Sequence, residues 1–279
     1  MINQNVKRTK HENKISVDSL LPYLGEARVE SLICLDQVDS TNTRLKELAK
    51  AGAKTGTVVI ANEQTKGRGR LGRSFQSDAD DGIYLSMLMR PDCAIEALPE
   101  ITAWVAVCVA KAIESVIPEQ VEIKWVNDIL LNHKKICGIL NEMSVEGAKG
   151  ELKYLVCGIG VNVHNKRESF PEELQAVASS IEAETQRAVD RSQLAAQIIL
   201  ELDQMVSQWP AHKTEYLAFY KSRCVNLGKE VYVLRNQEKA RGKVIALTDN
   251  FQLLIEYEDG TREAVSSGEV SVRGLYGYV

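Results

Sequence analysis

The sequence contains the stretch Gly67-Arg-Gly-Arg-Leu-Gly-Arg73, in which three glycines are interleaved with three arginines. Glycine has no Cβ, so it lets a backbone approach a ligand closely and adopt positive φ. Arginine carries a permanent charge on a planar group that matches carboxylates and phosphates. Because the formal net charge of the chain is −4, this loop is a local positive feature in an acidic protein. It predicts a site for an anionic ligand rather than a general nucleic-acid surface.

The same glycines also fit the Gly-x-Gly-x-x-Gly fingerprint of dinucleotide-binding folds, with Asp92 twenty residues after Gly72. That fingerprint needs a helix that starts at the loop and holds the pyrophosphate at its N-terminus. The residues that follow, 74–82, read Ser-Phe-Gln-Ser-Asp-Ala-Asp-Asp-Gly and carry no apolar helical stripe. We therefore reject the dinucleotide interpretation.

The composition is typical of a globular protein that stays inside the cell. With 279 residues, 44% of them hydrophobic, the chain is long enough for one large domain and a smaller one. No apolar run approaches the roughly 18 residues that span a bilayer, and the N-terminus lacks the apolar core of a signal peptide. Six cysteines and four histidines are scattered without a Cys-x-x-Cys pair. We expect reduced thiols, no structural metal, no membrane segment and a cytoplasmic location.

Hydrophobic periodicity predicts a mixed α/β fold followed by a small β unit. Residues 1 to about 15 are polar and predicted to be disordered. The predicted strands of one mixed sheet are 31–35, 57–61, 83–89, 121–125, 129–131, 135–145 and 152–163. The predicted helices are 19–24, one from the polar cluster 36–42 to Gly52, 99–116, 190–209 and 214–223. Beyond about residue 225, short strands with tight turns are predicted at 230–234, 243–248, 252–257 and 269–273, with a hairpin turn at Asp259-Gly260.

Five segments in order resemble the biotin protein ligase family, the biotin–[acetyl-CoA-carboxylase] ligases. One is the loop, preceded by Glu63-Gln64 and followed by Ser74-Phe75. The others are Asp39-Ser-Thr-Asn42, Lys124-Trp-Val-Asn-Asp128, Lys135-Ile-Cys-Gly-Ile-Leu140 and Gly158-Ile-Gly-Val-Asn-Val163, and the tail Gly268-Glu-Val-Ser-Val-Arg273 resembles the family's C-terminal barrel. The resemblance runs from about residue 28 to the end. It implies an α/β (α+β) fold with three parts: a polar segment at 1–27, a mixed-sheet, class II synthetase-like catalytic domain at 28–224, and an SH3-like β-barrel at 225–279.

The resemblance also implies a two-step reaction. Biotin is activated with ATP to biotinyl-5′-AMP, and the biotinyl group is then transferred to a lysine of a biotin carboxyl carrier protein. The first step brings a carboxylate close to a triphosphate, so the arginines of the loop are suited to neutralise the like charges. Lys135 and Arg68 are the predicted catalytic residues. The residues implied to bind biotin are Ser40, Thr41, Asn42, Gln64, Gly67, Arg68, Gly69, Arg70, Lys135 and Gly138. Taken alone, Ser40–Asn42 also fit an ordinary helix N-cap.

A second set of residues is implied to bind ATP and the adenylate. Asp128 is also the candidate ligand for Mg²⁺. Two positions depart from the family pattern: Val126 stands where proline is usual, and Phe75 where tryptophan is common. Trp104 and Trp125 are expected in the core. The implied nucleotide-binding residues are Arg68, Arg70, Arg73, Phe75, Asn127, Asp128, Lys135, Asn162, Glu269 and Arg273.

Two alternative functions stay open at this point: a lipoate–protein ligase, although its Arg-Arg-x-Ser-Gly-Gly-Gly loop is missing here, and a non-catalytic biotin sensor. Some family members carry an N-terminal winged helix-turn-helix of roughly sixty residues. Only 39 residues precede Ser40, so we expect no DNA binding. The expected partner is a biotin-accepting carrier domain, and a homodimer is left open.

Overall fold

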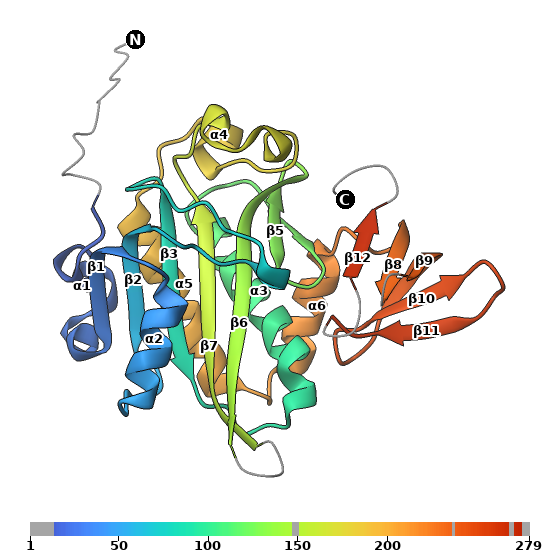
Figure 1. Ribbon diagram of the computed structural model, residues 1–279, viewed down its shortest axis with the longest axis horizontal. Coiled ribbons are helices and arrows are strands. Elements are labelled where there is room, and N and C mark those ends of the chain that lie inside the picture. Colours follow the sequence, from blue (N-terminus) through green and yellow to red (C-terminus); the bar gives the residue numbers. More distant parts are fainter. Residues whose placement is uncertain (1–13, 147–150, 236–237, 268–270, 275–279) are drawn as a thin grey trace.

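A large mixed sheet, covered by helices on both faces, lies beside a small antiparallel sheet in the computed structural model (Figure 1). The structure describes residues 14–146, 151–235, 238–267 and 271–274. The strands of the large sheet are β1 (Leu32–Val38), β2 (Val58–Gln64), β3 (Gly82–Met89), β4 (Glu122–Lys124), β5 (Asp128–Leu131), β6 (Lys134–Glu146) and β7 (Glu151–Asn162). The helices are α1 (Val17–Leu24), α2 (Thr41–Lys50), α3 (Leu98–Glu114), α4 (Ile181–Thr185), α5 (Arg191–Gln208) and α6 (Lys213–Arg223). Short 3₁₀ turns are η1 (Glu26–Ser31), η2 (Arg70–Gly72), η3 (Ile95–Ala97), η4 (Arg167–Ser169) and η5 (Glu172–Leu174).

The strand order of the large sheet is β1-β2-β3-β7-β6-β5-β4. β1 runs parallel to β2, and all other neighbours in this sheet are antiparallel. Each strand that the sequence predicts for this sheet is present, although β1 continues to Val38 instead of ending at residue 35. The mixed α/β class is therefore confirmed.

The two faces of this sheet bury different clusters, because successive strand side chains point to opposite sides. Along β7, Leu155, Cys157 and Ile159 belong to the main core, which α3 and α5 cover, whereas Tyr154 and Val156 pack with α2 on the other face. In Figure 1, α2 lies in front of the sheet and α3 and α5 lie behind it. The face that carries α2 is the one that continues into the candidate site.

Helix α3 is the most deeply buried helix of the described chain, with Pro99 in its first turn as predicted. Its Trp104 is fully buried and stacks on Tyr216 of α6 with ring centroids 3.8 Å apart. The prediction that Trp104 is a core residue is confirmed. No helix among the described residues is both long and apolar enough to span a bilayer.

The C-terminal part forms a five-stranded antiparallel sheet within the described residues, in the order β11-β10-β9-β8-β12. The predicted Asp259-Gly260 turn is present, with Gly260 at φ +81°. The sequence prediction missed strand β11, as well as the short helix α4. The strands are β8 (Glu230–Arg235), β9 (Glu238–Leu247), β10 (Leu253–Tyr257), β11 (Arg262–Val265) and β12 (Ser271–Gly274).

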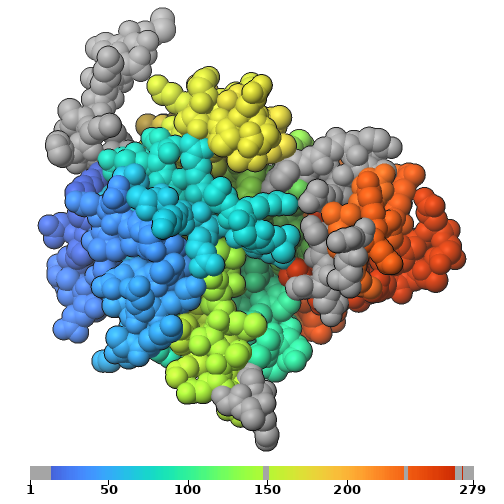
Figure 2. All heavy atoms as spheres, in the orientation of Figure 1, coloured from blue at the N-terminus to red at the C-terminus, as the bar shows by residue number. Residues whose placement is uncertain are grey.

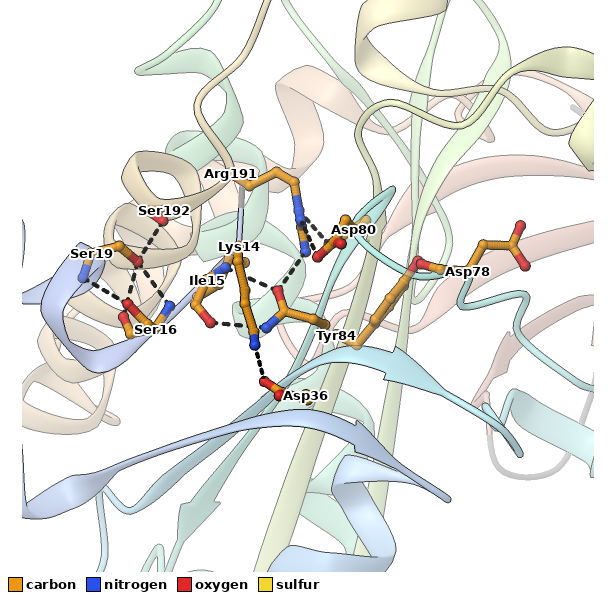
Figure 3. Close-up of polar contacts among 12 residues, drawn as sticks. Lys14, Ile15, Ser16, Ser19, Asp36, Asp78, Asp80, Tyr84, Arg191 and Ser192 are labelled. Atoms are coloured by element: carbon orange, nitrogen blue, oxygen red, sulfur yellow. Dashed lines mark hydrogen bonds and ion pairs between the residues drawn. The ribbon is translucent and has the colours of Figure 1, made fainter. Parts of the chain in front are cut away.

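A buried cation joins the N-terminal segment to the main sheet (Figure 3). The Arg191 side chain is fully buried: Nε donates to the Gly82 carbonyl at 2.9 Å, Nη2 donates to Asn62 Oδ1 at 3.2 Å, and Nη1 lies 3.4 Å from Asp80 Oδ1. Asn62 in turn accepts from the Ile15 N–H and donates to the Ile15 carbonyl, both at 2.9 Å. Ile15, at the end of the segment predicted to be disordered, is therefore buried and ordered. Residues 1–13 lie outside the described residues.

We expect Arg191→Met to destabilise the protein by about 3 to 5 kcal/mol, because it leaves buried acceptors without their cation. The measurement is the urea midpoint of unfolding. Arg187→Met is the matched control, since Arg187 is 60% exposed and its ion pair with Glu119 spans 3.5 Å; such surface pairs contribute about 0 to 1 kcal/mol. Equal midpoint shifts in the two variants would show that the buried network is not a major source of stability.

Candidate active site

A cavity of about 580 Å³ lies over β6 and β7, beneath the segment that carries the arginine loop. In the space-filling view this segment, coloured cyan, crosses the front of the molecule toward the small sheet (Figure 2). The structure brings fourteen of the sequence-predicted site residues together in the wall of this cavity: Ser40, Thr41, Asn42, Gln64, Arg68, Gly69, Arg70, Arg73, Phe75, Asn127, Asp128, Lys135, Gly138 and Asn162.

Three predicted residues are not among these described lining residues. Gly67 lines a neighbouring open depression instead, and a Cβ there would overlap the Phe75 carbonyl and lie 2.6 Å from Ser77 Oγ. Gly67 is therefore required by a close backbone approach within the loop. Glu269 lies outside the described residues. Arg273 is on β12 opposite Tyr232, and its side chain is not among those described.

The floor of the cavity is a face of the sheet that carries glycines. Gly158 and Gly160 follow Tyr154 and Val156 at the same two-residue spacing on β7, and Gly138 on β6 pairs with Gly160. A Cβ at Gly160 would lie 2.5 to 2.9 Å from atoms of the Phe75 ring, and one at Gly158 would overlap the Asn42 amide. The missing side chains therefore let Phe75 and Asn42 lie directly against the sheet.

Polar side chains at the start of α2 form a connected network at one end of the cavity. Gln64 Oε1 accepts from the Thr41 N–H at 2.9 Å and from the Thr41 hydroxyl at 3.1 Å, and Gln64 Nε2 donates to Ser77 Oγ at 2.9 Å. The Ser86 hydroxyl on β3 lies 2.6 Å from Asn42 Oδ1 and 2.7 Å from Thr41 Oγ1. These side chains hold one another in fixed orientations in a buried wall.

Ser40 occupies the N-cap position of α2, but its side chain makes no capping hydrogen bond. Its side chain is 2% exposed and lines the cavity. The ordinary N-cap interpretation of Ser40–Asn42 is therefore right for the helix boundary and wrong for the Ser40 hydroxyl.

Lys135 and Asp128 form an ion pair at the other end of the cavity, with Nζ 2.6 Å from Oδ1. The pairing of β5 with β6 shifts by one residue between Cys137 and Lys135. This irregularity turns Lys135 to the side of Gly138, where a Cβ would lie 3.1 Å from Nζ. In a regular strand, side chains alternate between the two faces of the sheet, and Lys135 would point to the face opposite Gly138. The irregularity turns Lys135 into the cavity instead.

Two loop arginines are tethered at opposite sides of the cavity. Arg70 Nη1 donates to Asn127 Oδ1 and Nη2 donates to the Ser267 carbonyl, both at 2.8 Å. Arg68 Nη1 lies 2.9 Å from Glu142 Oε1 on β6. Burial lowers the pKa of Arg70, while the nearby Asp128 charge acts in the opposite direction; an arginine keeps its charge in this setting. Arg73 is exposed and lines the cavity mouth.

Trp125 combines the predicted core role with a place in the wall. Its side chain is 7% exposed, and its Nε1–H donates to the Phe251 carbonyl of the small unit at 2.8 Å. Its neighbour Val126 departs from the family pattern; the Val126 side chain is 1% exposed, and the Trp125–Val126 peptide is cis.

Several contributors were missed by sequence reasoning. Lys124 is 8% exposed and lines the cavity, Ser86 supports Asn42 and Thr41, Ser267 accepts from Arg70, and Glu142 holds Arg68. Lys124 stands inside a quoted motif and could have been found there. Glu142 lies two residues after the Lys135–Leu140 motif and Ser267 directly precedes the Gly268–Arg273 tail, whereas Ser86 is in no motif. The contacts of the folded chain identify the roles of all three.

Among the described residues, no cluster of three or more His, Cys, Asp and Glu side chains is placed to hold a metal. Asp128 is the single acidic residue among the described residues that line the cavity. A lone carboxylate fits a Mg²⁺ ion that is held mainly by substrate phosphates, which is how proteins usually bind this ion.

Sequence comparison matches residues 34–162 to the Biotin/lipoate A/B protein ligase family and residues 227–273 to the Biotin protein ligase C terminal domain. The bifunctional ligase/repressor BirA of Bacillus spizizenii is 32% identical over 243 residues, which cover 87% of this chain and 74% of that protein. The biotin–[acetyl-CoA-carboxylase] ligase of Mycobacterium tuberculosis is 30% identical over 240 residues, which cover 84% and 86%.

Structure comparison agrees. The biotin protein ligase of Aquifex aeolicus in complex with biotin and ATP superposes with a TM-score of 0.75 at 32% identity, covering 88% of this chain and 99% of that one. The fold and the cavity define a member of the biotin and lipoate protein ligases. Within that class, the chain belongs to the biotin protein ligase family.

We expect Gly160→Ala to expel the Phe75 ring from the sheet and so loosen the arginine loop. Tryptic cleavage after Arg68, Arg70 and Arg73, measured without ligands, should become several-fold faster. Phe75→Ala removes the atoms with which the new methyl group collides. In that background Gly160→Ala should therefore add little, and a further large acceleration would contradict this role for Phe75.

Proposed function

We propose that this protein activates biotin with ATP to biotinyl-5′-AMP and transfers the biotinyl group to a lysine of a biotin carboxyl carrier protein. The observation that carries the proposal is a single cavity with two different ends. One end holds the buried polar network of Thr41, Asn42 and Gln64, and the other holds the Lys135–Asp128 pair beside Arg70. A molecule with a polar ring, an apolar body and a carboxylate matches this order of chemistry.

Biotin suits the α2 end. Its ureido ring presents donors and acceptors that need partners once they are buried. Ser40, Thr41, Asn42 and Gln64 provide hydroxyls and amides there. Gly69 and Gly138 line the same cavity.

ATP suits the opposite end. Arg68, Arg70 and Arg73 supply the positive charge that the triphosphate and the biotin carboxylate need in order to approach each other. Phe75 and Asn162 are proposed to contact the adenylate, and this is supported by their place in the cavity wall; Asn127, bonded to Arg70, is proposed to do the same. Glu269 and Arg273 stay predictions for nucleotide contact.

In the first step a biotin carboxylate oxygen attacks the α-phosphorus of ATP, and the bond to the β-phosphate oxygen breaks to release pyrophosphate. Negative charge builds up on the transferring oxygens, and Lys135 Nζ is the cation placed to stabilise it, with Asp128 fixing its position. In the second step the neutral amine of the carrier lysine attacks the acyl carbon, AMP leaves with the bonding electrons, and the nitrogen releases a proton to water as the amide forms. Arg68 stabilises the charge on the departing phosphate.

The proposal also covers the metal ion, the closure of the small sheet, the location of the protein, its oligomeric state and its domain limits. Mg²⁺ would be held by Asp128 together with ATP phosphates and would neutralise part of the triphosphate charge. The five-stranded C-terminal sheet is proposed to close as an SH3-like barrel. A cytoplasmic location, a homodimeric state and the domain limits at residues 27/28 and 224/225 stay predictions.

The direct test is biotin-dependent exchange of labelled pyrophosphate into ATP, followed by transfer of biotin to a purified carrier domain. A ligase shows both reactions, whereas a biotin sensor shows neither. A lipoate ligase would prefer lipoate in the exchange reaction. Absence of exchange with biotin would overturn the proposal.

We expect Lys135→Ala to lower the rate of adenylate formation by about 10²- to 10³-fold, the usual effect of removing one group that stabilises transition-state charge. Biotin affinity, measured by calorimetry, should change far less because Lys135 lies at the nucleotide end. Lys134→Ala is the matched control: the neighbouring ammonium pairs with Glu184 at 2.9 Å outside the cavity. Equal losses in both variants would rule out a specific role for Lys135.

A further inference from the structure

Three side chains, two from helix α2 and one from the arginine loop, contact Glu142 on β6. Its Oε1 lies 2.9 Å from Lys46 Nζ and 2.9 Å from Arg68 Nη1, and its Oε2 accepts from Asn42 Nδ2 at 2.9 Å. The Glu142 side chain is 18% exposed. One carboxylate thus connects the arginine loop to two side chains of helix α2, one of which is the asparagine at the biotin end of the cavity.

These contacts define how the loop is fastened. At one side Arg70 ties the loop to Asn127 and Ser267, and at the other side Arg68 ties it to Glu142. Gly69 alone separates the two arginines, and all three residues line the cavity. Release of the Arg68 contact would remove the ion pair that fastens this side of the loop to β6.

The surrounding charges keep Glu142 ionised and able to hold Arg68. Two cations, Lys46 and Arg68, contact the same carboxylate oxygen. Partial burial acts to raise the pKa of Glu142, but hydrogen bonds from Asn42 and Lys46 and the charges of Lys46 and Arg68 outweigh it and lower that pKa. A guanidinium has five N–H donors, so Arg68 can contact Glu142 through Nη1 and an anion in the cavity at the same time.

We propose that Glu142 is a positioning residue that holds Arg68, and with it the arginine loop, across the cavity and thereby sets how long the acyl-adenylate stays bound. The inference rests on the proposed ligase function for the identity of the ligand. Glu142 acts through Arg68 and does not itself touch the substrate.

The test uses the full chain with Glu142→Gln, which keeps the size of the side chain and removes its charge. Release of labelled biotinyl-5′-AMP into an excess of unlabelled adenylate should become about tenfold faster, the effect expected from losing a hydrogen bond between charged groups. Tryptic cleavage after Arg70 and Arg73 in the absence of ligands should also accelerate. Glu146→Gln, on the same strand but paired only at the surface with Lys153 at 2.8 Å, should change neither rate.

A double-mutant cycle separates positioning from a general structural effect. Arg68→Gln alone should accelerate cleavage and release as Glu142→Gln does. Because the Arg68 side chain is 47% exposed, this variant should fold and so tests the contact even if Glu142→Gln does not fold. In the Arg68→Gln background, Glu142→Gln should add less than twofold. Equal effects in both backgrounds, or unchanged adenylate release in Glu142→Gln, would overturn the inference.

The two proposals fail in different ways. Cleavage of the loop is measured without biotin or ATP, so it tests the Arg68–Glu142 tether whatever the ligand is. If Glu142→Gln leaves loop cleavage unchanged while the parent protein exchanges pyrophosphate normally, only the proposed role of Glu142 is contradicted. If the parent shows no exchange but Glu142→Gln still accelerates loop cleavage, only the ligase function is contradicted.

Discussion

The cavity exists because one face of the central strand pair carries no side chains where the chain must come closest to it. Tyr154 and Val156 fill this face beneath α2, and Gly158 and Gly160 leave it open a few residues further along β7. Asn42 and Phe75 lie in the space that Cβ atoms would otherwise take. A helix start and a loop that are distant in sequence are thereby brought onto one surface, and the polar and apolar parts of the site follow from that approach.

The contacts that hold the loop arginines explain how an acidic protein concentrates positive charge at one site. Loop arginines in water would repel one another and move freely, but here two of the three are held: Arg68 by Glu142 on β6, and Arg70 by Asn127 in the turn between β4 and β5 and by the Ser267 carbonyl. Folding fixes the orientation of these charges before a ligand binds. Preorganised charge in a partly water-excluded cavity stabilises a polyanionic transition state more than the same charge on a mobile chain.

The sequence predicted the order and type of nearly every element, because long apolar runs such as 83–89 and 152–163 leave few alternatives. It also predicted most of the cavity wall, since those residues occur in motifs with a recognisable order. It did not predict β11 or α4, which are short and largely polar. Nor could it predict Glu142, Ser86 or Ser267, because a charged or hydroxyl residue on a strand has no distinctive local pattern until the fold brings it to its partner.

Hydrogen bonds from Trp125 and Arg70 join the small C-terminal unit to the cavity. Trp125, which lines the cavity, donates through its indole to the Phe251 carbonyl and through its backbone to Asn226 Oδ1, both at 2.8 Å. Ile123, two residues earlier, pairs with Cys224 in an isolated parallel bridge at the point where the chain passes into the small unit. With Arg70 bonded to the Ser267 carbonyl, these contacts fix the small unit to both the wall and the loop of the cavity. A shift of the small unit would therefore move Arg70 and the wall around Trp125 before it disturbed the buried network around Asn42.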